Sequence, residues 1–191
     1  MQNPEISRRL MQQSSLLSVL AADDGFTQIT WHIMKAVADV ISRNGVLLTC
    51  GNGGSASQAQ HLAAEVVGRF RTERAALPAV SLTADSAVVT ALGNDFGFDQ
   101  VFARQLDAWK HVPVILAAFT TSGNSLNVVN ALRRAQDLGM TAVCMTGGDG
   151  GMASQVCPLT AVVPSRETSA VQEVHEVLIH LIADAVDALH A

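Results

Sequence analysis

The stretch VLLTCGNGGSASQAQHLAAEVV, residues 46–67, is the most informative part of the chain for the fold. It begins with five apolar or small residues, 46–50, that run directly into a glycine-rich segment. A short apolar run that ends at glycine is typical of a buried strand followed by a turn. The residues after the turn, 55–70, have the composition and apolar spacing of a helix. The stretch therefore predicts a strand, a tight turn and a helix in succession.

The same alternation of short apolar runs and longer helical segments continues along the chain. We expect strands at 46–50, 78–82, 112–119, 141–146 and 159–164, and helices at 4–22, 26–43, 55–70, 85–95, 98–109, 125–139 and 167–190. Residues 120–125 and 147–152 are expected to be loops. Alternation of this kind is typical of βαβ units, which form a parallel sheet covered by helices on both faces. The prediction is an α/β three-layer sandwich with a five-stranded parallel sheet, preceded by N-terminal helices at 1–43.

Length and composition exclude several classes of protein. The 191 residues predict one domain, 1–191, with its α/β core at 44–191, and 49% hydrophobic against 15% charged residues is a globular composition. A net charge of −5 argues against nucleic acid as a ligand. No apolar run approaches the roughly 18 residues of a membrane span, and the first residues lack the apolar core of a signal peptide. We therefore expect a cytoplasmic protein without a membrane partner.

The three cysteines, Cys50, Cys144 and Cys157, lie in or beside apolar runs without the spacing of a metal site. An odd number of cysteines in a cytoplasmic chain provides no disulfide framework. We expect all three to be small buried thiols.

The segment TTSGNS, residues 120–125, lies between a predicted strand and a predicted helix. It offers four hydroxyl groups, and the free N–H groups at the start of the helix favour an anion at the same place. The absence of lysine and of the P-loop pattern excludes a nucleotide P-loop. A phosphate monoester on a small metabolite fits this composition, and an ordinary helix N-cap fits it equally well.

The segment GNGGSA, residues 51–56, also satisfies the dinucleotide-binding pattern G-x-G-x-x-A. That pattern requires an acidic residue about 20 positions further on, at the end of the second strand. The only candidate is Asp85, 34 positions after Gly51, which is too far for a compact βαβ unit. Dinucleotide binding is therefore the weaker interpretation of this turn.

Two helices carry side chains suited to acid–base or metal chemistry. His61 and Glu65 are four positions apart and so lie on one face of a helix. Such a pair can provide a general base or share a divalent metal, although surface pairs of this kind are also common. The last helix carries Gln172, His175 and His180, of which the first and last share a broad face. A histidine at position 180, among apolar neighbours, is also consistent with a simple core residue.

Several motifs together resemble a known family. CGNGGSASQAQHLAAE, LGNDFGFDQVFARQ, TSGNSLNVV, TGGDGGMA and VPSRET…VQEVHEVLIH are similar, in order and spacing, to the phosphoheptose isomerases of the SIS (sugar isomerase) domain class. The resemblance covers nearly the whole chain. It implies the flavodoxin-like SIS fold and the isomerisation of sedoheptulose 7-phosphate to D-glycero-D-manno-heptose 7-phosphate, a step towards lipopolysaccharide heptose. It also implies a homotetramer, with residues 1–43 used in oligomer packing and active sites where subunits meet.

The resemblance assigns roles to particular residues. It implies that Glu65 and His180 are the acid–base pair. It implies zinc, one ion per subunit, bound by His61, Glu65, Gln172 and His180. The substrate contacts that it implies are Asn52, Gly53, Gly54, Ser55, Glu65, Asn94, Asp95, Thr120, Thr121, Ser122, Ser125 and Gln172. The chain departs from the family pattern at Pro113 and Val114, at Thr120 where serine is commoner, and at Ala170 where a basic residue is usual.

The chemistry of an aldose–ketose isomerisation agrees with these roles, because a base must take a proton from C1 and an acid must supply one to the oxygens through an enediol. We expect Glu65 to be the base and His180 the acid. The alternative is a non-catalytic SIS protein that binds the replication initiator DnaA or acts as a sugar-phosphate-sensing regulator. The DnaA-binding relative lacks an acidic residue at the place of Glu65, so the presence of Glu65 favours the enzyme.

Overall fold

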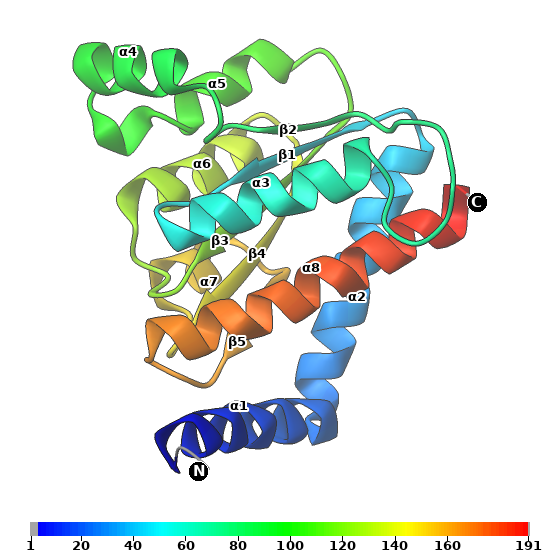
Figure 1. The fold of residues 1–191 in the computed structure, drawn as a ribbon. Coiled ribbons are helices and arrows are strands. Elements are labelled where there is room, and N and C mark those ends of the chain that lie inside the picture. Colours follow the sequence, from blue (N-terminus) through cyan, green and yellow to red (C-terminus); the bar gives the residue numbers. More distant parts are fainter. Residues whose placement is uncertain (1–3, 191) are drawn as a thin grey trace.

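The computed structural model describes residues 4–190 and contains one five-stranded sheet (Figure 1). The strands are β1 (Val46–Cys50), β2 (Ala79–Ser81), β3 (Val114–Thr120), β4 (Thr141–Gly147) and β5 (Thr160–Val163). All neighbouring strands are parallel, and their order is β2-β1-β3-β4-β5. This is the flavodoxin-like order, which confirms the predicted fold class.

Helices cover both faces of the sheet and form two hydrophobic cores. One face is covered by α2 (Asp24–Ser42), α3 (Gly54–Val67) and α8 (Thr168–His190), and the other by α5 (Ala103–Leu106), α6 (Leu126–Asp137) and α7 (Gly151–Val156) (Figure 1). Every residue of β3 is buried, with Phe119 in the first core and Leu116 in the second. Alternate side chains of a strand point to opposite faces, so a strand that is covered on both sides is apolar throughout.

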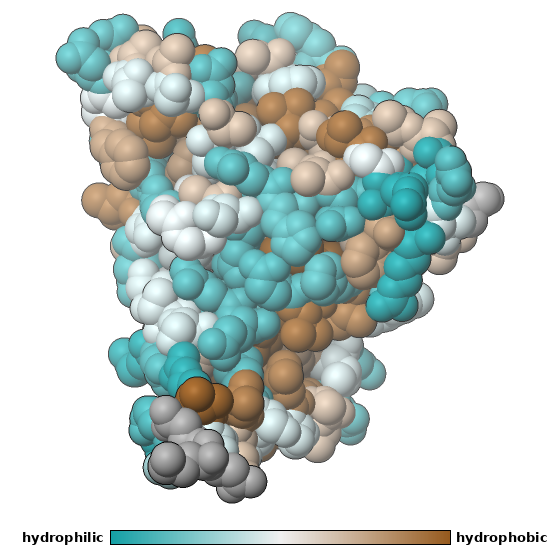
Figure 2. Space-filling view, viewed as in Figure 1, coloured by the Kyte–Doolittle hydropathy of each residue, from teal (hydrophilic) through white to brown (hydrophobic). Residues whose placement is uncertain are grey.

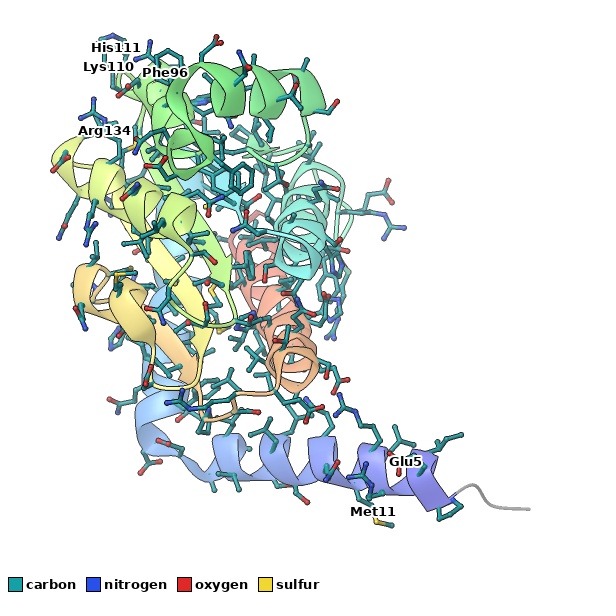
Figure 3. All side chains as sticks on the ribbon, turned by 90° about the vertical axis from the view of Figure 1, so that its left-hand side faces the viewer. Glu5, Met11, Phe96, Lys110, His111 and Arg134 are labelled. Carbon is teal, nitrogen blue, oxygen red and sulfur yellow. The ribbon has the colours of Figure 1, made fainter. Side chains whose placement is uncertain are left out.

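Two helices lie at the edges of this sandwich. The first, α1 (Pro4–Ala22), buries only Leu20, and α4 (Ser86–Phe96) buries none of its residues. They lie at opposite ends of the molecule, with Glu5 and Met11 on α1 and Phe96 on α4 (Figure 3). Neither helix is stabilised by extensive burial within this single chain.

The helix predicted at 98–109 is wrong in detail, because the structure has two short 3₁₀ helices, η1 (Phe98–Gln100) and η2 (Asp107–Trp109), on either side of α5. The segment contains no glycine or proline that would signal a break. Its irregular path buries Val101, Phe102 and Leu106 in the second core, so tertiary packing determines the local structure.

Two further predictions near glycines need correction. Residues 147–152 were expected to be a loop, but α7 begins at Gly151. The helix expected at 85–95, whose Gly93 and Asn94 are residues typical of a turn, continues as α4 to Phe96 and ends before Gly97, which has φ of +90°. Glycine adopts a positive φ without strain, so the end of the helix lies at the later glycine.

The structure also tests the predictions for the cysteines and for membrane-spanning helices. Cys50, Cys144 and Cys157 are free and buried, as expected, and burial raises the pKa of the Cys50 thiol to about 12. Within residues 4–190, no helix combines the length and apolarity that crossing a bilayer requires.

Candidate active site

The order of the strands reverses between β1 and β3, which are paired neighbours in the sheet. In sheets of this order, ligands bind outside the carboxyl ends of the strands at the point where the order reverses. Here that point lies beyond Cys50 of β1 and Thr120 of β3. The segments that the sequence singled out, 51–56 and 120–125, lie there, and the structure forms loops at 51–53 and 121–125.

The two loops are joined directly by a pair of amides. Asn52 Nδ2 donates to Asn127 Oδ1, Asn127 Nδ2 donates to Asn52 Oδ1, and both distances are 2.8 Å. Asn127 is buried and lies in the first turn of α6. The reciprocal pair therefore fixes the position of the β1 loop against the start of α6.

The glycines of the first loop are required by its geometry. Gly53 has φ of +55°, a conformation that favours glycine. A Cβ atom on Gly54 would lie 2.4 Å from Nε2 of Gln172, because the amide of Gln172 packs against the start of α3. Ser55 is buried beside this contact, and its backbone N–H donates to the carbonyl of Asn52.

The second loop presents the hydroxyls that the sequence predicted. Thr120 is buried and its Oγ1 donates to Ser125 Oγ at 3.4 Å. Ser122 is exposed, and its Oγ accepts from the N–H of Asn124. Thr121 and Ser125 are half-buried. The loop thus presents side-chain hydroxyls, together with N–H groups of the first turn of α6, as a site for an anion.

A second glycine-rich segment, residues 147–153, packs against the hydroxyl loop. Gly123 has φ of +69°, and a Cβ atom there would lie 2.1 Å from the carbonyl oxygen of Gly150. The N–H of Met152 donates to Asn124 Oδ1, and the N–H of Ala153 donates to the carbonyl of Gly123. The start of α7 and the hydroxyl loop therefore form one closely packed unit that tolerates only glycine at position 123.

The helices α3 and α8 lie side by side and run in the same direction (Figure 1). Each carries a row of polar residues facing the other helix. The rows are Gln58, His61 and Glu65 on α3, and Gln172, Glu176 and His180 on α8. Spacings of three or four positions place each row on one face of its helix. The paired rows form the polar seam between the two helices.

His61 lies at the centre of this seam between two carboxylates. Its Nε2 is 3.1 Å from Glu65 Oε1, and its Nδ1 is 2.8 Å from Glu176 Oε2. The His180 ring meets the His61 ring edge to face, with centroids 5.2 Å apart. The ring of Phe70 stacks on the ring of His180, with centroids 5.1 Å apart and an interplanar angle of 12°. The structure therefore brings His61, Glu65 and His180 together.

A buried ion pair holds the end of α3. Arg74 donates to the backbone carbonyls of Glu65 and Val66, and its Nε lies 2.8 Å from Asp187 Oδ1. The two side chains are 1% and 4% exposed. Burial acts to raise the pKa of Asp187, but hydrogen bonds from the N–H of Thr72 and from Arg74 outweigh it and leave the pKa below its usual value. This pair anchors the backbone that carries Glu65.

Other residues that the sequence singled out lie elsewhere. Asn94 and Asp95 are exposed on α4 and bond to each other at 2.8 Å, and within residues 4–190 no hydrogen bond joins them to the two loops. Asp85 is the N-cap of α4, where its side chain accepts from two backbone N–H groups. His175 is the core histidine of α8, and burial lowers its pKa to about 4.

The four residues assigned to zinc lie in two places along the seam. His61, Glu65 and His180 are close together, whereas Gln172 lies two turns earlier on α8 with its amide against Gly54. Within the described part of the chain, no three His, Cys, Asp or Glu side chains form a ready metal-binding group. The Nε2 and Oε1 atoms of His61 and Glu65 are nonetheless 3.1 Å apart, close to the roughly 3.3 Å between two ligand atoms of a tetrahedral zinc ion.

Four residues of the site were not identified from the sequence: Gln58, Phe70, Asn127 and Glu176. Helical spacing could have identified Glu176, because it lies four positions after Gln172 and four before His180. No local signal distinguishes Phe70 or Asn127, whose positions depend on contacts between distant segments.

The fold and the two loops define a SIS domain protein, and the SIS domain family model matches residues 26–147. The chain is 42% identical over 183 residues to a phosphoheptose isomerase of Pelobacter propionicus, with 96% of each chain covered. It is 45% identical over 153 residues to one of Aliarcobacter butzleri, covering 80% of this chain and 81% of the relative. The structure of a phosphoheptose isomerase from Francisella tularensis superposes with a TM-score of 0.90 at 33% identity, covering 96% and 97% of the two chains. The chain belongs to the phosphoheptose isomerase family.

Proposed function

We propose that this chain isomerises sedoheptulose 7-phosphate to D-glycero-D-manno-heptose 7-phosphate, in the synthesis of heptose precursors of lipopolysaccharide. The proposal is supported by family membership over nearly the whole chain. The observation that carries it is the cluster of His61, Glu65 and His180 on the adjacent helices α3 and α8. The relatives reported above provide no support for the alternative, a DnaA-binding or regulatory SIS protein.

The phosphate of the substrate lies at the hydroxyl loop. Side-chain hydroxyls of Thr120, Thr121, Ser122 and Ser125 and the N-terminus of α6 provide donors for it. The loop after β1, with Asn52, Gly53, Gly54 and Ser55, contacts the hydroxyl groups of the sugar, and Gln172 reaches the same place past Gly54. The family resemblance also assigns substrate contacts to Asn94 and Asp95, which within one chain lie on α4 and apart from the two loops.

Glu65 is the base and His180 the acid. Glu65 takes the proton from C1 of the ketose while His180 donates a proton to the carbonyl oxygen at C2, which gives the enediol. Glu65 then returns its proton to C2 while the deprotonated His180 takes the proton from the hydroxyl at C1, which gives the aldose. Within residues 4–190, Glu65 contacts His61 through Oε1 alone, so its Oε2 is left to carry the proton. The stack of Phe70 on His180 holds the imidazole in place for the second transfer.

Zinc, one ion per subunit, is held by His61, Glu65, Gln172 and His180. Imidazole nitrogens and carboxylate oxygens are the ligands that zinc prefers, and the 3.1 Å between His61 Nε2 and Glu65 Oε1 suits two of its ligands. When bound, the ion supplies positive charge that stabilises the developing negative charge on the sugar oxygens. His61 has no acid–base role in this scheme and serves to orient its neighbours.

The active assembly is a homotetramer in the cytoplasm, built on the N-terminal helices at 1–43. Apolar side chains gather on the face where α1, α2 and α8 meet (Figure 2). A groove there has a volume of about 390 Å³, and a second of about 400 Å³ shares Trp31 and Met34 with it. Trp31 is 58% exposed in the single chain. Contiguous apolar surface of this kind is typical of a face that packs against another subunit.

The test is isomerisation of sedoheptulose 7-phosphate in D₂O by purified protein with a defined zinc content, followed by NMR. We expect turnover with solvent deuterium at C2 of the aldose, because the abstracted proton exchanges on the base. Sedoheptulose without phosphate is the matched control and should react far more slowly. Turnover without deuterium would mean that the hydrogen passes from C1 to C2 without exchange with solvent, and no turnover by a folded, zinc-supplied protein would exclude the function.

A further inference from the structure

Thr146 lies near the end of β4, directly beside Thr120, where the hydroxyl loop begins. The two residues are paired across the parallel strands β3 and β4. Side chains alternate between the two faces of a strand, and Ala118 and Cys144, two positions earlier on each strand, both lie in the second core. Thr120 and Thr146 therefore point to that same face, which α6 and α7 cover.

The hydroxyl group of Thr146 is buried without a hydrogen-bond partner. The residue is 0% exposed, and within residues 4–190 its Oγ1 neither donates nor accepts a hydrogen bond. A buried, unpaired hydroxyl disfavours folding, and a valine side chain would fill the same space without that penalty. Packing therefore gives no reason for a hydroxyl at this position, and its use must be sought in the neighbouring hydroxyl loop.

A bound phosphate changes how Thr120 uses its hydroxyl group. In the structure, Oγ1 of Thr120 donates its single hydrogen to Ser125 Oγ at 3.4 Å. Phosphate oxygens are acceptors, so Thr120 and Ser125 would both turn their hydrogens towards a phosphate bound at the loop. A hydroxyl that donates to an anion becomes a better acceptor itself, because hydrogen bonds in a chain polarise one another.

Thr146 is placed to be the donor that Thr120 then accepts. Neighbouring strands lie about 4.8 Å apart, and threonine hydroxyls on adjacent strands can bond to each other. Rotation about the Cα–Cβ bond of Thr146 brings its Oγ1 towards Thr120 on the same face of the sheet.

We propose that Thr146 is a positioning residue of the anion site, which donates to Thr120 when a phosphate monoester is bound. The chain of hydrogen bonds runs from Thr146 through Thr120 to a phosphate oxygen and holds Thr120 in the rotamer that faces the ligand. Thr146 does not touch the substrate and has no part in the proton transfers. This role rests on the proposed function, because it requires phosphate at the hydroxyl loop.

The experiment compares the wild type with Thr146→Val, Thr146→Ser and the control Thr30→Val. Thr30 is also buried, and its Oγ1 also has no partner within residues 4–190, but it lies in the groove between α1, α2 and α8. Valine keeps the shape of threonine without the hydroxyl, whereas serine keeps the hydroxyl. Titration calorimetry measures the affinity for sedoheptulose 7-phosphate and for inorganic phosphate, and urea denaturation measures the free energy of unfolding.

We expect Thr146→Val to bind both ligands about 3–10-fold more weakly, as the loss of one neutral hydrogen bond predicts. KM should rise by the same factor while kcat stays unchanged, and Thr146→Ser should keep most of the affinity. Both valine variants should be at least as stable as the wild type, because each loses an unpaired buried hydroxyl. A purely structural role would give the reverse, lower stability with unchanged affinity.

The double variant Thr120→Val and Thr146→Val tests the path of the effect. Because Thr146 acts only through Thr120, the double variant should bind no more weakly than Thr120→Val alone. Additive losses would overturn the proposal, and so would a Thr146→Val protein with wild-type affinity for both ligands.

The same measurements separate this role from the proposed function. If the wild type binds the sugar phosphate but does not turn it over, the proposed function fails and the affinities still decide the role of Thr146. A wild type that binds neither ligand overturns the role of Thr146 together with the phosphate site.

Discussion

Asn52 and Asn127 donate a hydrogen bond to each other, both at 2.8 Å, beyond the carboxyl ends of β1 and β3. The two residues are 75 positions apart in the sequence. Their pairing ties the glycine-rich turn after β1 to the first turn of α6. The two loops proposed to hold the sugar and its phosphate are thereby held as one rigid unit.

Asn127→Ala should therefore affect substrate binding as well as stability. Removing one amide leaves Asn52 without its partner, which is expected to cost about 1–3 kcal/mol of unfolding free energy. We expect KM for the sugar phosphate to rise on the order of tenfold, because loop position contributes to alignment of the substrate. Urea denaturation and steady-state kinetics measure the two effects. A double variant with Asn52→Ala should show less than additive losses, and full additivity would mean that the two amides act independently.

Glu65→Gln should remove the proposed base while preserving the fold. A positioned general base contributes about 10²–10⁴-fold, so kcat should fall by that amount. Glu73→Gln, which changes an exposed carboxylate in the following loop, is the control and should leave kcat unchanged. A Glu65→Gln enzyme within a few-fold of the wild-type rate would show that Glu65 is not the base.

The double variant Ser122→Ala and Ser125→Ala should weaken binding of the phosphate. Each hydroxyl is expected to contribute a charge-assisted hydrogen bond of about 1.5–3 kcal/mol, so affinity should fall by at least tenfold. Isothermal titration with the sugar phosphate measures the change. Ser42→Ala, at the end of α2, is the control. Equal affinity of variant and wild type would mean that these two hydroxyls serve only the local turn.

Asp187→Asn should destabilise the protein strongly. Asp187 is the only carboxylate that pairs with Arg74 within the described residues, and both side chains are almost fully buried. Removing one charge of a buried pair costs about 3–5 kcal/mol, since the other charge is left uncompensated. Asp184→Asn is the matched control, because Asp184 pairs with Arg71 in a far more exposed position. Similar midpoints for both variants in chemical denaturation would refute this role for the Arg74–Asp187 pair.

His175 should make stability depend on pH. Burial lowers its pKa from 6.5 to about 4, so the unfolded chain binds a proton between these values that the folded chain does not. The free energy of unfolding should have its full value above pH 6.5 and should fall by about 3 kcal/mol as the pH drops to 4. His175→Leu should flatten the slope of unfolding free energy against pH, whereas His111→Leu, at an exposed position, should not. An unchanged slope in His175→Leu would assign the pH dependence to other groups.

The sequence was sufficient for the sheet because strands such as 114–120 are apolar on both faces and bounded by loops. It was insufficient at 98–109 and at α7, where packing against the second core determines the local path. The segment 98–109 has no turn signal of its own, whereas the glycines at 147–151 favour a loop and hide the start of α7. Element boundaries therefore followed from local pattern wherever the pattern was strong, and from tertiary contacts elsewhere.

The candidate site was predictable in part for a similar reason. His61 and Glu65 share a face whatever surrounds them, so their proximity follows from helical spacing alone. Helical spacing does not reveal which of His175 and His180 is buried in the core, since both lie among apolar residues of α8. His175 faces the sheet beneath the helix, with its ring against Phe119, whereas His180 faces α3. How deeply each imidazole ring is buried depends on which helix or strand packs against it in the folded chain.

The polar seam between α3 and α8 has a consequence during synthesis of the chain. His61 and Glu176 are separated by 115 residues, so at roughly 5–20 residues per second the ribosome needs on the order of ten seconds to supply the partner helix. Throughout this interval α3 has no α8 to cover it. The apolar residues Leu62 and Val66, which are fully buried in the folded chain, are then open to contact with chaperones or other nascent chains. Translation speed between these two helices is therefore a determinant of the yield of folded protein.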